Sequence, residues 1–157
     1  YIMKIKCIAI GKTKSQDFSS LIKSYLSKIN HYINFEFIIL NEIKSIKNKS
    51  IQKNKEAEAI LKNIKADSHI ILLDENGKEL SSVFFSKFIQ HHLNSSKKEI
   101  IFIIGGAYGF SDKLLKRANE KISLSKMTFS HQMVRIIFLE QLYRSFTILK
   151  NEPYHNN

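Results

Sequence analysis

Three charged side chains interrupt a strongly apolar segment near the C-terminus. Arg135, Glu140 and Arg144 fall within the run 131–150, whose other residues are mostly apolar. A guanidinium that is taken out of water needs a partner. Glu140 and Arg144 stand four residues apart, a spacing that lets them pair on a helix. Arg135 is therefore the freer of the two arginines and the better candidate for contact with a substrate.

A glycine-rich turn follows the apolar run 100–104. Gly105, Gly106 and Gly109 lack a Cβ and so let the backbone approach a ligand closely. Ligands of open α/β sheets bind beyond the carboxyl ends of strands, where such turns lie. The spacing fits neither G-x-G-x-x-G nor a Walker A loop. A tight turn that needs positive φ explains the same glycines, so a ligand site and a turn both remain open.

A second candidate segment, 124–131, mixes apolar and small polar residues just before a helical pattern. Such a loop can wrap an aromatic ring and offer backbone hydrogen bonds to it. An ordinary connection between a strand and a helix explains the segment equally well.

Other chemistry-bearing residues give weaker signals. The sequence has no C-x-x-C, no H-E-x-x-H and no clustered acidic loop, so no metal site is predicted. It has no G-x-S-x-G elbow, which argues against a serine hydrolase. His91 and His92 are interpreted as surface residues. Tyr154 and His155, next to the only proline, would by themselves be a solvated chain end.

The elements that position these residues follow from apolar periodicity. Alternating or continuous apolar runs predict strands, and spacings of three and four predict helices. Strands are expected at 4–10, 34–40, 69–73, 99–104 and 122–124, with a turn at 74–78. Helices are expected from 18 to 29, 56 to 64, 81 or 82 to about 93, 111 to beyond 117, and 131 to 150. The lysine-rich stretch 41–54 is expected to be a loop.

Alternating strands and helices predict one α/β domain, residues 3–157, with a mostly parallel sheet flanked by helices. Tyr1 and Ile2 precede Met3 and are left outside it. A single cysteine excludes a disulfide-built domain. No apolar run approaches the roughly 20 residues that span a bilayer, and no signal peptide opens the chain, so a cytoplasmic protein without membrane contact is expected. The helix at 131–150 is apolar on nearly all sides, which predicts a second subunit on one of them.

The formal net charge is +11 over 157 residues. A basic surface favours a polyanionic partner, most often nucleic acid. Only three of the basic residues are arginines, the better readers of phosphate geometry, and the Lys, Ile and Asn bias fits AT-rich coding DNA. Charge alone therefore leaves nucleic-acid binding undecided.

Four segments in this order carry a family resemblance. They are 72–78 (LLDENGK), 104–109 (IGGAYG), 124–144 with HQMVR and EQLYR, and the closing 153–155 (PYH). Together they resemble the bacterial ribosomal RNA large subunit methyltransferases H of the SPOUT superfamily, over essentially the whole chain. Two departures are Ser130, where many relatives have proline, and Asn156-Asn157, where relatives often have a basic residue.

The resemblance implies a SPOUT-type fold with a C-terminal trefoil knot, a homodimer, and S-adenosylmethionine as methyl donor without a metal. It implies that the methyl acceptor is ring nitrogen 3 of a pseudouridine of 23S rRNA in the ribosome. The donor-site positions carry over to Leu73, Gly105, Leu124, Ser125, Lys126, Met127, Thr128 and Phe129.

The resemblance also implies roles for individual side chains. Arg135 would stabilise the anion that forms as the base loses its proton, His155 would accept that proton, and Tyr154 would stack on the base or the donor. His131 and Arg144 are expected to contact substrate RNA. The alternative is a non-catalytic module that binds RNA or the ribosome and retains the knot fold without binding the donor.

Overall fold

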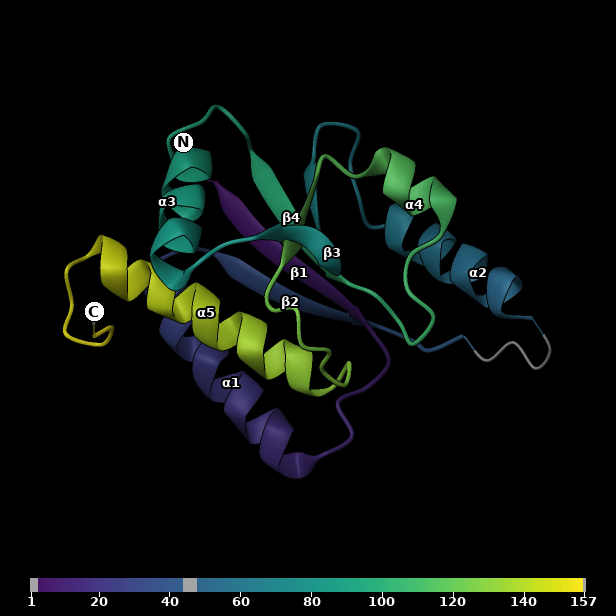
Figure 1. Cartoon of the computed structure of the whole chain (residues 1–157), viewed down its shortest axis with the longest axis horizontal. Helices are drawn as coiled ribbons and strands as arrows, with labels where there is room; N and C mark the ends of the chain where they lie inside the picture. The colour runs from purple at the N-terminus through teal and green to yellow at the C-terminus, as the bar shows by residue number, and fades with distance from the viewer. Residues whose placement is uncertain (1–2, 44–47, 157) are drawn as a thin grey trace.

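A single parallel sheet organises the protein, whose computed structural model describes residues 3–43 and 48–156 (Figure 1). In this part of the chain five strands pair in the order β2-β1-β4-β3-β5. Their bounds are β1 (Lys4–Ile10), β2 (Phe35–Leu40), β3 (His69–Glu79), β4 (Glu99–Ile104) and β5 (Glu120–Ser123). The α/β class and the parallel sheet predicted from the sequence are confirmed.

Helices cover both faces of the sheet (Figure 1). One layer contains α1 (Gln16–Asn30), α3 (Ser82–Leu93) and α5 (Met133–Leu149), with α5 between the other two. The second layer contains α2 (Lys49–Leu61) and α4 (Asp112–Arg117). The central strand β4 serves both layers. Ile100 and Phe102 face the first apolar cluster, and Ile101 and Ile103 face the second. A strand buried on both faces reads as an unbroken apolar run, which is why its sequence does not alternate.

Helix boundaries follow side-chain caps. Ser81 and Ser111 accept hydrogen bonds from backbone N–H groups at the starts of α3 and α4. Asn48 does the same for α2, so this helix begins at Lys49, inside the stretch expected to be a loop. Residues 44–47 of that expected loop lie outside the described residues. Helix α4 ends at Arg117 and β5 begins at Glu120, both earlier than expected.

Strand β3 continues through the turn that was expected at 74–78. Leu73 and Lys78 both pair with Ile122, so the residues between them are accommodated as an irregularity in the ladder. Gly77 lies against the backbone of β5, where an added Cβ would stand 2.7 Å from the Ile122 nitrogen. At this irregularity the backbone of β3 approaches that of β5 so closely at position 77 that only glycine fits.

The exposure of α5 leaves the expected second subunit open, whereas that of His92 needs correction. In one chain α1 and α3 pack on the flanks of α5 and Phe138 and Leu139 are buried, but Met133 is 38% exposed and Ile136 and Ile137 are only partly buried. His92 is not a surface residue. It is 3% exposed, and burial lowers the pKa of its imidazole to about 4. His91 is exposed as expected.

Across residues 3–43 and 48–156, none of the helices is both long enough and apolar enough to cross a membrane.

Candidate functional site

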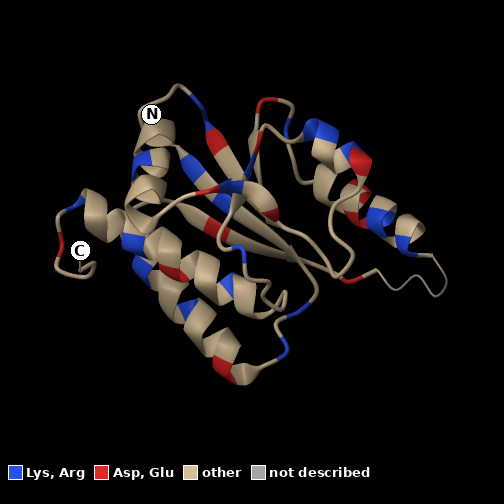
Figure 2. Cartoon of the chain, viewed as in Figure 1, with Lys and Arg blue, Asp and Glu red and all other residues tan. Residues whose placement is uncertain are grey.

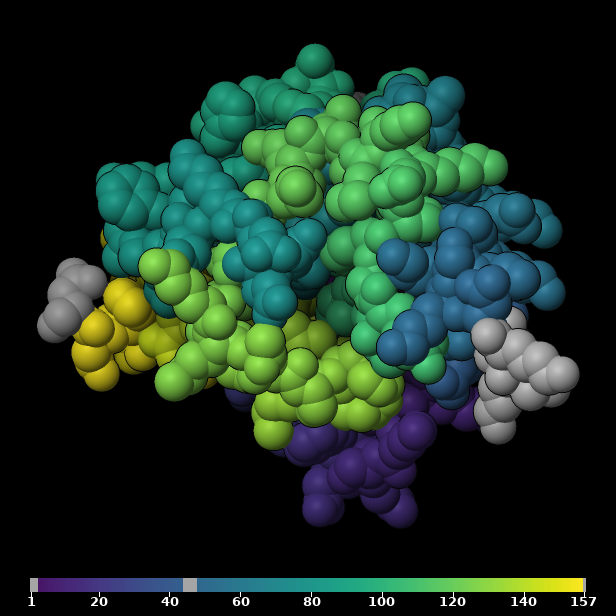
Figure 3. Space-filling view, turned by 45° about the vertical axis from the view of Figure 1, so that its right-hand side comes forward, coloured from purple at the N-terminus to yellow at the C-terminus, as the bar shows by residue number. Residues whose placement is uncertain are grey.

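The main cavity lies at the carboxyl ends of β3, β4 and β5, where ligands of parallel sheets bind. Three segments enclose it: 73–76 after the first part of β3, 104–110 after β4, and 124–131 before α5. Figure 3 shows these segments meeting on one face of the molecule. The volume is about 620 Å³, within the usual range for small-molecule sites.

Most of the predicted donor residues line this cavity. The lining includes Leu73, Gly105, Leu124, Ser125, Met127, Thr128 and Phe129. Lys126 is the exception, because its side chain is 82% exposed and its ammonium lies 3.5 Å from Glu79. His131 also lines the cavity, whereas Arg135, Arg144, Tyr154 and His155 do not.

The glycine turn is both a tight turn and part of the cavity lining, the two interpretations that the sequence left open. Only Gly109 has positive φ, at +81°, so only this glycine is required by backbone conformation. Gly105 and Gly106 are required by space. An added Cβ on Gly105 would stand 3.0 Å from the Phe110 ring, and one on Gly106 would stand 2.6 Å from the Glu56 carboxylate. The turn is thus a packed wall of the cavity.

Serine hydroxyls shape the segment before α5. Ser123 donates to the Ser125 carbonyl at 2.8 Å, and the Ser125 hydroxyl accepts from the Met127 N–H at 2.9 Å. Ser130, where many relatives have proline, accepts from the Met133 N–H at 3.1 Å. Such local bonds hold a loop in one conformation without regular secondary structure. Ser130 therefore anchors the start of α5.

Arg135 is not the freer of the two arginines. Its side chain is fully buried, and its three nitrogens donate to the Ile10 carbonyl, the His131 carbonyl and the Thr13 hydroxyl. Gln132 bonds to the same loop, through the Lys12 carbonyl and the Lys14 N–H. The two side chains tie the loop after β1 to the start of α5. Arg135 is therefore placed to position the cavity wall.

His131 presents a neutral imidazole at the cavity. Burial lowers its pKa below the ordinary value, and the nearby Arg135 guanidinium lowers it further. Its Nδ1 is buried and has no hydrogen-bond partner among the described residues. Because Nδ1 is enclosed by protein, a ligand in the cavity would reach this nitrogen only after the ring turns.

A second cluster of site residues forms at the C-terminal half of α5. Glu140 accepts from two nitrogens of Arg144, at 2.6 and 3.0 Å, as the four-residue spacing predicted. It also accepts from the Tyr154 hydroxyl at 3.1 Å. The Arg144 guanidinium lies 4.8 Å from the Tyr154 ring centre. The chain end is therefore folded against α5 and is not a frayed tail.

Hydrogen bonding fixes the protonation of this cluster. Arg144 Nη1 lies 3.0 Å from His155 Nδ1. Since a guanidinium only donates, Nδ1 must accept, and a neutral His155 then carries its proton on Nε2. In this arrangement His155 is a hydrogen-bond donor; accepting a proton would first require its bond to Arg144 to break. Burial and the Glu140 carboxylate raise the pKa of Tyr154 to about 12.

The two groups of site residues lie apart within one chain. Val134 at the first turn of α5 lines the cavity, whereas Arg144 lies ten residues further along the same helix. At 1.5 Å per residue, this places them about 15 Å apart. Figure 1 shows the C-terminus beyond the end of α5 that is remote from the cavity segments. One small ring could not touch both groups.

Several cavity residues were not predicted as site residues. Asp74, Glu75 and Asn76 stand in the resembling segment 72–78 and line the cavity, as does Phe110. Glu56 packs behind Gly106, and its burial raises its pKa. Asp74, Glu75 and Asn76 could have been predicted from the sequence, because they form a polar turn directly after an apolar strand. Nothing local marks Glu56, which reaches the site from another helix.

A parallel sheet whose strand ends surround a ligand-sized cavity, with a packed glycine turn, matches the SPOUT class of methyltransferases. The sequence model described as "Predicted SPOUT methyltransferase" matches residues 3–155, and the chain belongs to this family. Among its relatives is the ribosomal RNA large subunit methyltransferase H of Christiangramia forsetii, 55% identical over 98% of this chain and 99% of that protein. Proteins of the same name from Flavobacterium johnsoniae and Parabacteroides distasonis are 54% and 50% identical over the same shares.

Proposed function

We propose that this methyltransferase transfers a methyl group from S-adenosylmethionine to ring nitrogen 3 of a pseudouridine in 23S rRNA of the large ribosomal subunit. The observation that carries the proposal is the cavity at the ends of β3, β4 and β5, lined by seven of the eight residues to which the resemblance assigns the donor. Relatives named for methylation of large-subunit rRNA, matching over nearly the whole chain, support the acceptor.

The cavity suits this donor in size and polarity. Leu73, Leu124 and Phe129 offer apolar surface for a purine ring, and the backbone of 124–129 offers hydrogen-bond groups. Asp74 and Glu75 place negative charge beside a ligand that carries a sulfonium and an ammonium group. When bound, the donor supplies an electrophilic methyl group, and the protein supplies orientation and electrostatics.

The cluster on α5 suits the acceptor base. A uracil-type ring must lose the proton on nitrogen 3, which passes to solvent water, and the resulting negative charge spreads onto the adjacent carbonyl oxygens. Arg144 and the Nε2–H of His155 are donors that can stabilise that charge. Tyr154 stays neutral near pH 7 and offers a ring face for stacking. We assign Arg135 a positioning role, through the loop after β1 and the start of α5.

We further propose that the working form is a homodimer in which the α5 cluster of one chain completes the donor cavity of the other. The separation of about 15 Å along α5 supports a shared site, since neither group of residues suffices alone. Phe129, Met133 and Tyr154 are exposed apolar side chains near the two halves, and a second copy would cover them.

A high net positive charge, +11, supports a contact with RNA phosphates. Figure 2 shows lysines and arginines on both helical layers and in the connecting loops. Such a dispersed distribution fits a protein that docks on a large folded RNA surface. Cytoplasmic localisation, where ribosomes are found, is part of the same proposal.

The experiment has two measurements. Calorimetry with S-adenosylmethionine should give saturable binding, and Gly105→Val should weaken it because the new side chain presses on the Phe110 ring, which lines the cavity. Ribosomes from a strain that lacks the activity should gain one methyl group, located by mass mapping of the rRNA. RNA binding without donor binding would favour the non-catalytic alternative.

A variant series separates the donor from the acceptor half. His155→Ala should lower turnover more than donor affinity, since its contact forms with the base in the transition state. Deletion of 154–157 should abolish methyl transfer and leave donor binding intact. A deletion variant that methylates ribosomes at the normal rate would refute the role of the chain end.

A further inference from the structure

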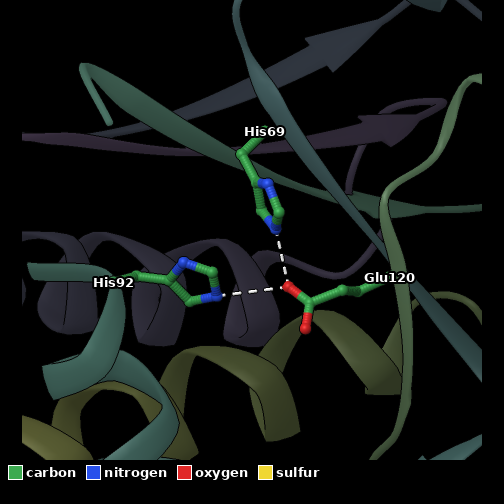
Figure 4. A group of neighbouring side chains, drawn as sticks. All are labelled: His69, His92 and Glu120. Carbon is green, nitrogen blue, oxygen red and sulfur yellow. Dashed lines mark hydrogen bonds and ion pairs between the residues drawn. The ribbon is translucent and has the colours of Figure 1, made fainter. Parts of the chain in front are cut away.

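Three side chains from different elements meet at the amino ends of the strands, opposite the donor cavity. His69 is the first residue of β3, Glu120 is the first residue of β5, and His92 belongs to the last turn of α3. Figure 4 shows both imidazole rings directed at one oxygen of the Glu120 carboxylate. The proposed methyl transfer uses none of the three.

The distances place three ligand-type atoms around one point. His69 Nε2 lies 2.6 Å and His92 Nε2 lies 3.2 Å from the same carboxylate oxygen. One ligand atom from each residue falls within 4.8 Å of the other two. Metal ligands of these types bind Zn²⁺ at about 2.0–2.2 Å, so small rotations of the side chains would place an ion between them.

Hydrogen bonding alone accounts for only part of this arrangement. His69 and Glu120 form a hydrogen bond, but His92 approaches the carboxylate without forming one. Neither ring nitrogen of His92 has a hydrogen-bond partner among the described residues, although the side chain is 97% buried. A buried polar group without a partner is costly. A cation held by Nε2 would satisfy the nitrogen that is aimed at the carboxylate.

The donor set indicates the class of ion. Two imidazoles and one carboxylate favour a divalent transition ion such as Zn²⁺, whereas Mg²⁺ and Ca²⁺ prefer sites made of oxygen alone. The Glu120 side chain is 38% exposed, which leaves the ion a path from solvent and a position for water. The Phe88 ring, 4.6 Å from the His92 ring, adds an apolar contact beside the site.

We propose that His69, His92 and Glu120 form a binding site for Zn²⁺ or a similar divalent transition ion. The ion would connect the starts of β3 and β5 to the end of α3. Because the donor cavity lies at the other end of the same strands, the role is to stabilise the fold and not to take part in methyl transfer. Sequence spacing predicted no metal site, since 23 and 28 residues separate the three positions.

The test is a competition titration of untagged, chelator-treated protein with Zn²⁺ and a chromophoric chelator. One equivalent should bind, with a rise in Tm of a few degrees at saturation, and Mg²⁺ should produce neither effect. Co²⁺ should give a visible absorption band typical of nitrogen and oxygen ligands in a site of low coordination number. Zn²⁺ saturation should leave the Kd for S-adenosylmethionine unchanged.

Variants assign the site. Glu120→Gln and His69→Gln keep side-chain volume and hydrogen bonding, and each should weaken Zn²⁺ binding at least tenfold. His91→Gln is the matched control, because His91 is an exposed neighbour of His92 on the same helix, and it should bind Zn²⁺ as the unmodified protein does. Absence of tight binding by the unmodified protein, or equal binding by Glu120→Gln, would overturn the proposal. Either result would leave the methyltransferase assignment standing.

Discussion

At the scale of single residues, the chain end shows how a charged network orders a segment that would otherwise fray. Glu140 is its centre, since it accepts from Arg144 and from Tyr154. Arg144 in turn bonds to His155. Arg144 and Tyr154 therefore depend directly on one carboxylate, and His155 depends on it through Arg144. In the proposed function, this network orients the three side chains before the acceptor base arrives.

The titration of Tyr154 reports this network. Its pKa of about 12 in the folded protein exceeds the unfolded value near 10, so the neutral phenol is favoured by folding. The contribution of Tyr154 to chain-end order is complete below pH 10 and is lost as the pH rises through 12. A UV difference titration of the protein against its Tyr154→Phe variant should give a midpoint near 12. Glu140→Gln should lower the titration midpoint of Tyr154. A midpoint near 10 in the unmodified protein would contradict the network.

Unlike Arg144, which lies partly exposed near the chain end, Arg135 is buried and bonds only to groups inside the fold. Arg135→Met should lower the free energy of unfolding by about 3 kcal/mol, because two carbonyls and one hydroxyl lose their donor in the interior. The matched variant Arg144→Met, whose side chain is 24% exposed, should cost about 1 kcal/mol or less. Urea unfolding measures both. Equal costs for the two variants would show that the buried bonds of Arg135 contribute little.

At the scale of elements, the irregularity at 74–77 in the pairing of β3 with β5 forms one wall of the cavity. The same stretch supplies Asp74, Glu75 and Asn76 to the cavity lining and pairs again with β5 through Lys78 and Glu79. Close passage of one backbone over another needs a residue without a side chain. Gly77 occupies that point.

Gly77→Ala should therefore destabilise the protein by about 2 kcal/mol or more, since the new Cβ meets backbone atoms of Lys121 and Ile122 that cannot rotate away. Donor affinity should fall as well, because the displaced segment forms one wall of the cavity. Lys78→Ala, at an exposed neighbouring position, is the control and should change neither Tm nor donor binding. An alanine variant as stable as the parent would mean that the two backbones are not in close contact at Gly77.

At the scale of the whole molecule, the separation of donor cavity and α5 cluster makes assembly the central question. Sedimentation should show a dimer at micromolar concentration. Packing of α1 and α3 covers only part of the apolar surface of α5, since Met133 is 38% exposed. The stronger argument is the pair of half-sites in one chain, which lie about 15 Å apart along a helix.

Mixing two inactive variants tests the shared site directly. Gly105→Val damages the donor cavity, and His155→Ala damages the α5 cluster. If one site takes residues from both chains, equal mixing with subunit exchange should restore about a quarter of the unmodified rate, since half the dimers contain one intact site of two. Sites contained within one chain would give no restoration.

The sequence by itself located most of the elements and identified the family, although the bounds of α2, β3 and β5 differ from those expected. Continuous apolar runs located the strands, and serines at helix starts located α3 and α4, because these signals are local. The ordered segments 72–78, 104–109, 124–144 and 153–155 predicted eight donor-site residues, seven of which line one cavity. That this cavity binds the donor stays a prediction. The trefoil knot stays a prediction.

Only the tertiary structure decided which side chains are free to act. The sequence favoured Arg135 over Arg144 for substrate contact, yet Arg135 is buried and donates to the Ile10 carbonyl and the Thr13 hydroxyl, more than a hundred residues away in the chain. It also placed His92 at the surface, whereas packing of α3 buries that ring beside His69 and Glu120. Periodicity describes one face of one element. Which distant groups meet that face depends on how strands and helices pack, and this is set by the whole chain at once.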